Sequence, residues 1–319
     1  MARVSTALFG VLLFLHGCSP TSPQKPVRLR AGIPGVSPRL LAVYEPWFGH
    51  PAHISVGYSS HDPDELRKQI RAAKKMGIYA FVVDWYGDRD QFNGRTYQLL
   101  QPIAAEEKFH IAMMYDETSD EDGATDEAIA EFTEFHNAYL APNAPGHEAY
   151  LTDGGRPMIF IFPKGGHTDW NRVRAEVSKW NPAPLLIDEN LPDGNAGAFD
   201  GFYAWVQPGG KGWAADGSNW GADYLANFYS TMVSKYPDKI AVGGAWAQFD
   251  DSKASWSLNR HISARCGQTF QDTMNFWRKY YPPDQPLPYM MIDTWNDYEE
   301  GTAIESGIPT CGSEPKQTP

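Results

Sequence analysis

The feature that most constrains the fold of this chain is a series of eight short apolar segments that recur from about residue 39 onward. They are rich in Val, Ile, Phe and Tyr and cover residues 40–48, 79–86, 110–116, 157–162, 184–188, 201–206, 240–247 and 289–295. Nearly continuous apolar runs of this length are typical of strands buried on both faces, as in a parallel sheet. Helical periodicity lies between several of them, at 64–76, 125–140, 169–180, 224–236 and 269–281.

Strands that alternate with helices in this way predict an α/β protein with one (β/α)8 TIM barrel, which we place at residues 39–310. An open doubly wound sheet would carry a glycine-rich phosphate-binding turn after its first strand. This chain instead has Tyr44-Glu45-Pro46-Trp47-Phe48-Gly49 at that point. The sequence shows neither an internal repeat nor the boundary of a second domain, so the barrel is the favoured architecture.

The N-terminal segment is typical of a secretory signal peptide, predicted at residues 1–17. Arg3 precedes an apolar run at 7–15 that is too short to span a bilayer. The run ends in a Leu-His-Gly-Cys sequence that resembles a bacterial lipobox, with Cys18 as the lipidated residue. Residues 18–38, rich in proline, are predicted to form a tether, and 311–319 a flexible tail. The expected location is the cell envelope, periplasmic or at the cell surface; an ordinary signal peptide and a secreted protein are the alternative.

Charge limits the expected partners. The chain has 27 Lys and Arg against 39 Asp and Glu, a formal net charge of −12. An acidic protein of this kind is a poor match for nucleic acid or an anionic membrane surface. Membrane contact is therefore expected only through the lipid anchor, and the protein is expected to be a monomer. In an oxidising envelope, Cys266 and Cys311 could form a disulfide or remain two buried thiols.

Carboxylates and aromatic residues are concentrated at the predicted C-terminal ends of the strands, where the active sites of such barrels lie. Aromatic faces suit the C–H faces of sugar rings, and carboxylates supply hydrogen bonds and proton transfers for glycoside chemistry. A lone Trp can equally belong to the core, and an Asp can cap a helix. The expected substrate-binding residues are Tyr44, Glu45, Trp47, Asp84, Trp85, Tyr86, Asp116, Tyr203, Trp246, Trp295 and Asn296; Asp188, Glu189 and Trp205 also lie at strand ends.

The densest cluster, residues 293–305, resembles two glycoside hydrolase families. Trp295-Asn296-Asp297-Tyr298 followed by Glu300 resembles the signature of family 71, the fungal α-1,3-glucanases. The segment Glu-Gly-Thr-Ala-Ile-Glu at 300–305 is similar to that of family 99, the endo-α-mannosidases. Segments 44–49, 77–87 and 265–270 agree with the same group, so the resemblance covers roughly residues 40–306. It implies a (β/α)8 barrel that hydrolyses an α-linked glucan or mannan. Neither a cofactor nor a metal is expected.

By this resemblance, Asp297 and Glu300 are the catalytic pair, with Glu300 as the general acid and Asp297 as the general base. Family 71 inverts the anomeric centre, whereas in family 99 the first carboxylate deprotonates the sugar 2-hydroxyl and the product retains its configuration. The chain shares motifs with both, so Asp297 is expected to act on water or on that hydroxyl. Glu299 is expected to face solvent or to begin a helix, and an exchange of roles between Glu299 and Glu300 is the main local alternative.

Two other classes of function share parts of this pattern. A non-catalytic carbohydrate-binding barrel on the cell envelope would keep the aromatic residues without needing the carboxylate pair. A metal hydrolase could use His50 and His53 with Asp84, but two histidines in a loop rich in Gly and Pro are a weak ligand signal. The two histidines are expected instead to hydrogen-bond substrate or backbone.

Overall fold

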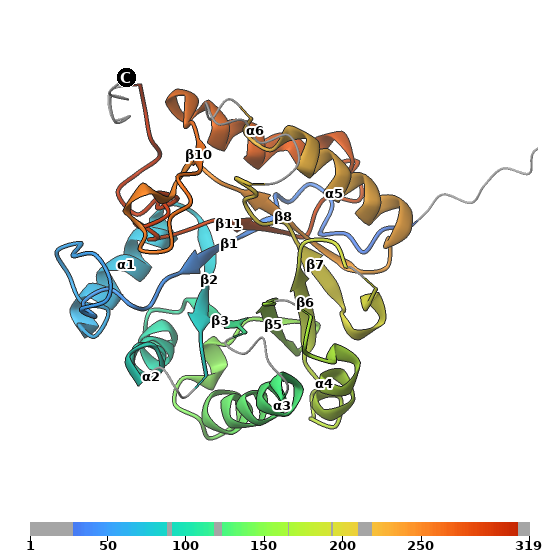
Figure 1. The fold of residues 1–319 in the computed structure, drawn as a ribbon. Helices are drawn as coiled ribbons and strands as arrows, with labels where there is room; N and C mark the ends of the chain where they lie inside the picture. The colour runs from blue at the N-terminus through green and yellow to red at the C-terminus, as the bar shows by residue number, and fades with distance from the viewer. Residues whose placement is uncertain are drawn as a thin grey trace, which may run out of the picture.

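The computed structural model describes residues 28–87, 91–117, 123–164, 166–192, 194–209 and 219–311, so the predicted signal peptide and Cys18 lie outside the described residues. Its centre is a closed ring of parallel strands surrounded by helices (Figure 1). β11 pairs with β1, and β3 pairs with β5 to close the ring. The prediction of a TIM barrel is confirmed. The barrel strands are β1 (Arg39–Tyr44), β2 (Ile78–Trp85), β3 (His110–Asp116), β5 (Arg156–Phe162), β6 (Leu185–Glu189), β7 (Gly201–Tyr203), β8 (Ile240–Ala245) and β11 (Tyr289–Ile292).

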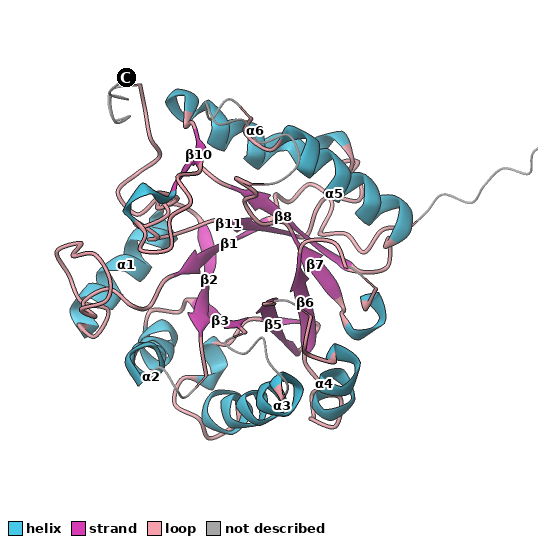
Figure 2. Ribbon diagram, viewed as in Figure 1, coloured by secondary structure: helices cyan, strands magenta, loops and turns pink. Residues whose placement is uncertain are grey.

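Helices cover the outside of this ring (Figure 2). Their bounds are α1 (Pro63–Lys75), α2 (Gln91–Glu106), α3 (Ala124–Phe135), α4 (Trp170–Val177), α5 (Ala222–Lys235) and α6 (Gln268–Phe276). Asp62 caps α1 by accepting a hydrogen bond from the Asp64 amide, and Pro63 occupies the first turn. Sequence periodicity missed α2 because its buried face includes Asn93, Thr96 and Gln101. Polar groups on the inner face weaken the apolar repeat.

Shorter elements complete the connections. α3 continues into a π-helical turn (His136–Leu140), and 3-10 turns lie at His147–Ala149, Ala196–Ala198, Asp251–Lys253, Arg265–Gly267 and Trp277–Lys279. β4 (Thr152–Asp153) pairs antiparallel with β5. β9 (Phe249–Asp250) and β10 (His261–Ile262) form a separate antiparallel hairpin in the connection that follows β8. This hairpin, which the sequence did not predict, is part of the site described below.

The folded domain begins earlier than predicted. The Arg30 amide donates to the Pro237 carbonyl at 2.6 Å, and the Gly32 amide donates to the Pro286 carbonyl at 2.7 Å. The Arg30 guanidinium also pairs with Asp153 at 2.7 Å. Residues 28–38 therefore pack on the barrel, at the end where the strands begin, so these residues do not belong to a free tether. None of the helices in the described part of the chain is long and apolar enough to cross a bilayer.

The last described residues are covalently joined to the barrel. Cys266, in the turn before α6, forms a disulfide with Cys311, which fulfils the first of the two expectations for these thiols. The bond connects the segment after β11 to the helix before it, and so closes a loop that contains the whole 293–305 cluster.

Candidate active site

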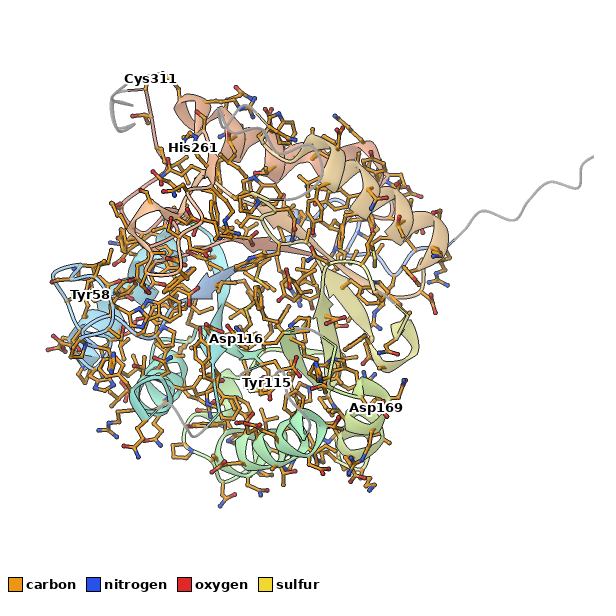
Figure 3. The ribbon with its side chains drawn as sticks, viewed as in Figure 1. Tyr58, Tyr115, Asp116, Asp169, His261 and Cys311 are labelled. Carbon is orange, nitrogen blue, oxygen red and sulfur yellow. A yellow bond between two sulfur atoms is a disulfide. The ribbon has the colours of Figure 1, made fainter. Side chains whose placement is uncertain are left out.

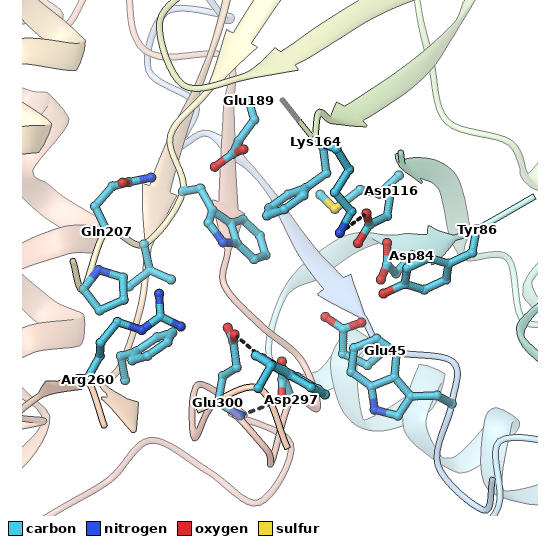
Figure 4. Close-up of a pocket in the computed structure, with 18 of the residues that line it drawn as sticks. Glu45, Asp84, Tyr86, Asp116, Lys164, Glu189, Gln207, Arg260, Asp297 and Glu300 are labelled. Carbon is cyan, nitrogen blue, oxygen red and sulfur yellow. Dashed lines mark hydrogen bonds and ion pairs between the residues drawn. The ribbon is translucent and has the colours of Figure 1, made fainter. Parts of the chain in front are cut away.

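A cleft of about 640 Å³ opens at the C-terminal ends of the barrel strands (Figure 4). Its walls combine six carboxylates with aromatic rings and three basic side chains. Side chains alternate between the two sides of each strand, so Asp116 points toward the barrel axis and the cleft whereas its neighbour Tyr115 contacts α3 (Figure 3). The lining includes Glu45, Trp47, His53, Asp84, Tyr86, Asn93, Asp116, Phe162, Lys164, Glu189, Trp205, Gln207, Phe249, Trp256, Arg260, Asp297 and Glu300.

The loop after β11 fixes Asp297 from several directions. The Asp297 amide donates to the Thr294 hydroxyl at 2.7 Å, and that hydroxyl lies 3.0 Å from the Thr302 hydroxyl. One carboxylate oxygen, Oδ1, accepts from the amides of Glu299 (2.9 Å) and Glu300 (2.8 Å). An aspartate that bonds to the amides two and three residues ahead turns the chain tightly, which places Glu300 over the same cleft. The sequence motif therefore acts as a local frame for two carboxylates.

Burial controls the protonation of this pair. Asp297 is 4 % exposed, and burial, reinforced by the nearby charge of Glu300, raises the pKa of Asp297 to about 8 despite its two amide bonds. Burial also raises the pKa of Glu300, opposed by a hydrogen bond from Trp256 and by the charge of Arg260. Because the two carboxylates repel each other, they lose their protons in successive steps that belong to the pair. Between these steps the pair holds one proton, which is the state that acid–base chemistry requires.

A second row of carboxylates faces the pair from the neighbouring strands (Figure 4). Burial, with the charge of Asp84 next, raises the pKa of Glu45 well above its usual range. Burial and the charge of Asp116 also raise the pKa of Asp84 well above its usual range. Burial raises the pKa of Asp116 to about 6, although the charge of Lys164, 3.5 Å away, opposes the shift. The Tyr86 hydroxyl opposes both shifts by lowering the pKa of each aspartate. Protonated carboxyls donate and accept hydrogen bonds, so this row suits the hydroxyls of a sugar.

Glu299, unlike the adjacent Glu300, is buried against the first loop of the barrel and not in the cleft. It is 2 % exposed, and its carboxylate accepts from the ring nitrogen of His53 at 2.8 Å and from the Ile54 amide at 3.2 Å. The prediction that Glu299 faces solvent or begins a helix is wrong, because these two donors draw it into the contact between the first and last loops. His53 in turn stacks on Trp47, with ring centroids 4.7 Å apart. Glu299 thus holds one wall of the cleft and does not line it.

Six expected binding residues do not line the cleft. Trp85 packs on Phe135, Trp246 donates its indole N–H to the Trp220 carbonyl, and Trp295 packs on Phe81. These three, together with Tyr44, Tyr203 and Asn296, are 0 % exposed. A ring binds sugar only through an accessible face, so these aromatic residues belong to the core and the expectation is corrected. Asn296 instead pairs with the Glu45 backbone, accepting from its amide at 2.7 Å and donating to its carbonyl at 2.9 Å.

The cleft also contains residues that the sequence did not single out. Lys164 follows β5, whereas Trp256 and Arg260 come from the β9–β10 hairpin. The only sequence signal for the hairpin pair was a long connection between the seventh predicted strand and the next helix. Trp205, which does line the cleft, was visible as an aromatic residue at a strand end.

His50 and His53, the candidate metal ligands of the alternative metal hydrolase, are not placed to form a metal site with their described neighbours. His50 accepts a hydrogen bond from the Ala52 amide at 3.2 Å, and His53 pairs with Glu299. Across the described residues, no group of three or more His, Cys, Asp or Glu side chains is placed to hold a metal ion.

Comparison with known proteins finds relatives that are named as endo-α-mannosidases or as endo-α-mannosidase-like. No established protein-family profile matches the sequence. The chain is 25 % identical over 271 residues to a mouse glycoprotein endo-α-1,2-mannosidase-like protein, and 21 % identical over 275 residues to a Xenopus laevis glycoprotein endo-α-1,2-mannosidase. Each match covers 79 % of this chain and 57 % of the relative, so the chain spans little more than half the length of these curated proteins.

A solved structure shares the fold. The family 99 endo-α-mannosidase from Bacteroides thetaiotaomicron superposes with a TM-score of 0.64 at 19 % identity, covering 84 % of this chain and 87 % of that one. The resemblance to endo-α-mannosidases that the sequence suggested is thus supported by relatives of that kind, whereas the resemblance to family 71 has no counterpart among these relatives.

Proposed function

We propose that this protein is a glycoside hydrolase that cleaves α-linked, mannose-containing oligosaccharides, with Glu300 as general acid and Asp297 as general base. The observation that carries the proposal is the arrangement of these two carboxylates. They are three residues apart on one hydrogen-bonded turn, both line the cleft, and burial raises the pKa of each. The names of the relatives supply the sugar and the linkage type.

The proposed reaction uses the protonated member of the pair first. Glu300 delivers its proton to the departing glycosidic oxygen, which breaks the bond to the anomeric carbon. In the form of the pair that has its proton on Glu300, Asp297 is ionised and removes a proton either from an attacking water or from the 2-hydroxyl of the sugar. In the second case the 2-oxygen attacks the anomeric carbon to form a 1,2-anhydro sugar. A water deprotonated by Glu300 then opens this ring at the anomeric carbon, and Asp297 returns its proton to the 2-oxygen. Hydroxyls of the bound sugar would hydrogen-bond the row formed by Glu45, Asp84 and Asp116, and the rings of Trp47 and Trp205 would contact its C–H faces.

A substrate screen tests this proposal. Purified protein would be incubated with α-1,2-linked mannose oligosaccharides, yeast mannan and α-1,3-glucan, and the configuration of the first product would be followed by ¹H NMR. We expect cleavage of a mannose-containing substrate. A retained product supports attack by the 2-hydroxyl, and an inverted product supports attack by water. Binding without turnover on every substrate would contradict the proposal and favour a non-catalytic carbohydrate-binding barrel.

We also propose that the protein is attached to the cell envelope through a lipid on Cys18. The support is the lipobox-like sequence at residues 15–18. In cells of a bacterial expression host, wild-type protein should sediment with membranes and Cys18→Ala should not. Sedimentation of both forms, or of neither, would contradict the anchor.

A further inference from the structure

The β9–β10 hairpin contacts the proposed general acid, and a buried carboxylate hydrogen-bonds to several groups of its connecting turn. Asp251 is 0 % exposed and accepts from the Arg260 guanidinium (2.8 Å), the Arg260 amide (2.9 Å), the Leu258 amide (3.1 Å) and the Ser257 hydroxyl (3.0 Å). These bonds surround the turn that carries Trp256. A carboxylate that satisfies several donors inside a loop fixes the backbone of that loop.

The same hairpin is tied to the catalytic loop. The Asp250 amide donates to the Glu300 carbonyl at 2.8 Å, and the Gln248 side chain donates to the Gly301 carbonyl at 2.8 Å. Two anchors on adjacent residues leave little freedom between the hairpin and Glu300. The position of Trp256 relative to the carboxyl of Glu300 is therefore set by the fold.

The Trp256 side chain links this hairpin to the carboxyl group of Glu300. It is 42 % exposed and lines the cleft, and its indole Nε1–H donates to Oε1 of Glu300 at 3.1 Å. Its ring lies edge-on to Trp47 and to His53, with centroids 6.5 and 6.4 Å away. The indole N–H therefore meets the proposed acid through one directed hydrogen bond.

We propose that Trp256 is a positioning residue that selects which oxygen of Glu300 carries the acid proton. This inference rests on the proposed function, in which Glu300 is the general acid. An indole N–H can only donate. Oε1 must therefore accept, and the proton of the neutral carboxyl is confined to Oε2, which is left free to protonate the departing oxygen. The bond also fixes the rotation of the carboxyl group, so that the proton is aimed before substrate arrives.

The charged groups around Glu300 act on it through their charge, whereas the indole of Trp256 donates a hydrogen bond to its carboxyl group. Asp251, Glu299 and Asp297 are carboxylates, and they act on Glu300 through charge. Arg260 is the nearby cation, but its guanidinium Nε donates to Asp251. The hydrogen bond from Trp256 also lowers the pKa of Glu300, against the larger upward effect of burial. Removing it should raise that pKa further.

Comparing substrates whose leaving groups do and do not need a proton distinguishes a residue that positions the acid from one that only binds the sugar. Trp256→Phe keeps a ring and deletes the donor. We expect it to lower kcat roughly tenfold or more on an α-1,2-linked mannose oligosaccharide, whose leaving oxygen needs a proton, and to shift the alkaline limb of the pH profile upward. On the corresponding glycosyl fluoride, whose leaving group needs no acid, kcat should change less than about threefold. Glu300→Gln should show the same selectivity, more strongly.

Trp205→Phe is the matched control, because Trp205 also lines the cleft but comes from the end of β7, on another part of the wall. It should affect both substrates to the same extent. Equal losses on both substrates in Trp256→Phe would overturn the proposal and leave Trp256 a binding residue.

A second measurement needs no turnover. In ¹H–¹⁵N spectra of the full chain, the Trp256 indole signal, identified by its loss in Trp256→Phe, should move with pH in the wild type and lose most of that movement in Glu300→Gln. An indole signal that is unaffected by Glu300→Gln would contradict the bond. If the wild type cleaves neither substrate, the proposed function fails, and the spectra alone decide the inference.

Discussion

Replacing Glu299 by alanine should destabilise the protein far more than it reduces turnover, although Glu299 is adjacent to the proposed acid. The substitution removes the acceptor for His53 at 2.8 Å and for the Ile54 amide at 3.2 Å, at a site that is 2 % exposed. Each lost bond to a buried carboxylate is worth about 1–2 kcal/mol, so we expect a loss of roughly 2–4 kcal/mol in the free energy of unfolding. Urea denaturation followed by Trp fluorescence at neutral pH measures it.

The two adjacent glutamates serve as controls for each other. Glu299→Gln keeps an acceptor for the Ile54 amide and should cost about half as much. Glu300→Gln should leave the free energy of unfolding within about 1 kcal/mol of wild type, because burial already disfavours the charge of Glu300. At a temperature where all variants are folded, Glu299→Ala should keep kcat within about tenfold of wild type, whereas Glu300→Gln should lower it by 10²–10⁴-fold. The reverse pattern, a stable but inactive Glu299→Ala together with an active Glu300→Gln, would refute the assignment of roles.

Three further predictions concern pH, packing and the disulfide. Because the pKa of Asp297 is raised to about 8 in the folded protein against about 4 in an unfolded chain, its contribution to stability is present at low pH and is lost as the pH rises through this window. Chemical denaturation at several pH values should show this fall in the wild type and a smaller fall in Asp297→Asn. Trp295→Ala should cost about 3–5 kcal/mol of stability because the ring is fully buried, whereas Trp205→Ala should chiefly raise KM, as denaturation and steady-state kinetics would show. Reducing the bond between Cys266 and Cys311, which are 45 residues apart, should lower the free energy of unfolding by about 2–4 kcal/mol, measured with and without dithiothreitol.

The barrel was predictable because its signal is repeated along the chain. Each of the eight predicted strands overlaps a barrel strand, and the prediction for β3 (His110–Asp116) matches at both ends. Continuous apolar runs mark strands that are covered on both faces, and that property does not depend on the loops. The weak point was α2, where Asn93, Thr96 and Gln101 face inward.

The cleft was predictable only in part, because position at a strand end does not tell which side of the barrel wall a residue faces. Asp84 and Tyr86 reach the cleft, whereas Trp85 between them packs against α3. The two-residue period of a strand contains this information once one inward residue is known. Trp256 and Arg260 carry no such signal. Their place depends on how a long connection folds around Asp251.

The central claim is that Asp297 and Glu300 together carry the reaction, and steady-state rates of three variants test it most directly. The measurement compares Asp297→Asn, Glu300→Gln and the double variant with wild type, on the mannose oligosaccharide that the wild type cleaves, after circular dichroism has confirmed that all are folded. Residues that act as one unit show non-additive losses. We predict a fall of at least about 10²-fold in kcat for each single variant, and a double variant little worse than the more damaged single one. A rate close to wild type in either single variant would contradict the account.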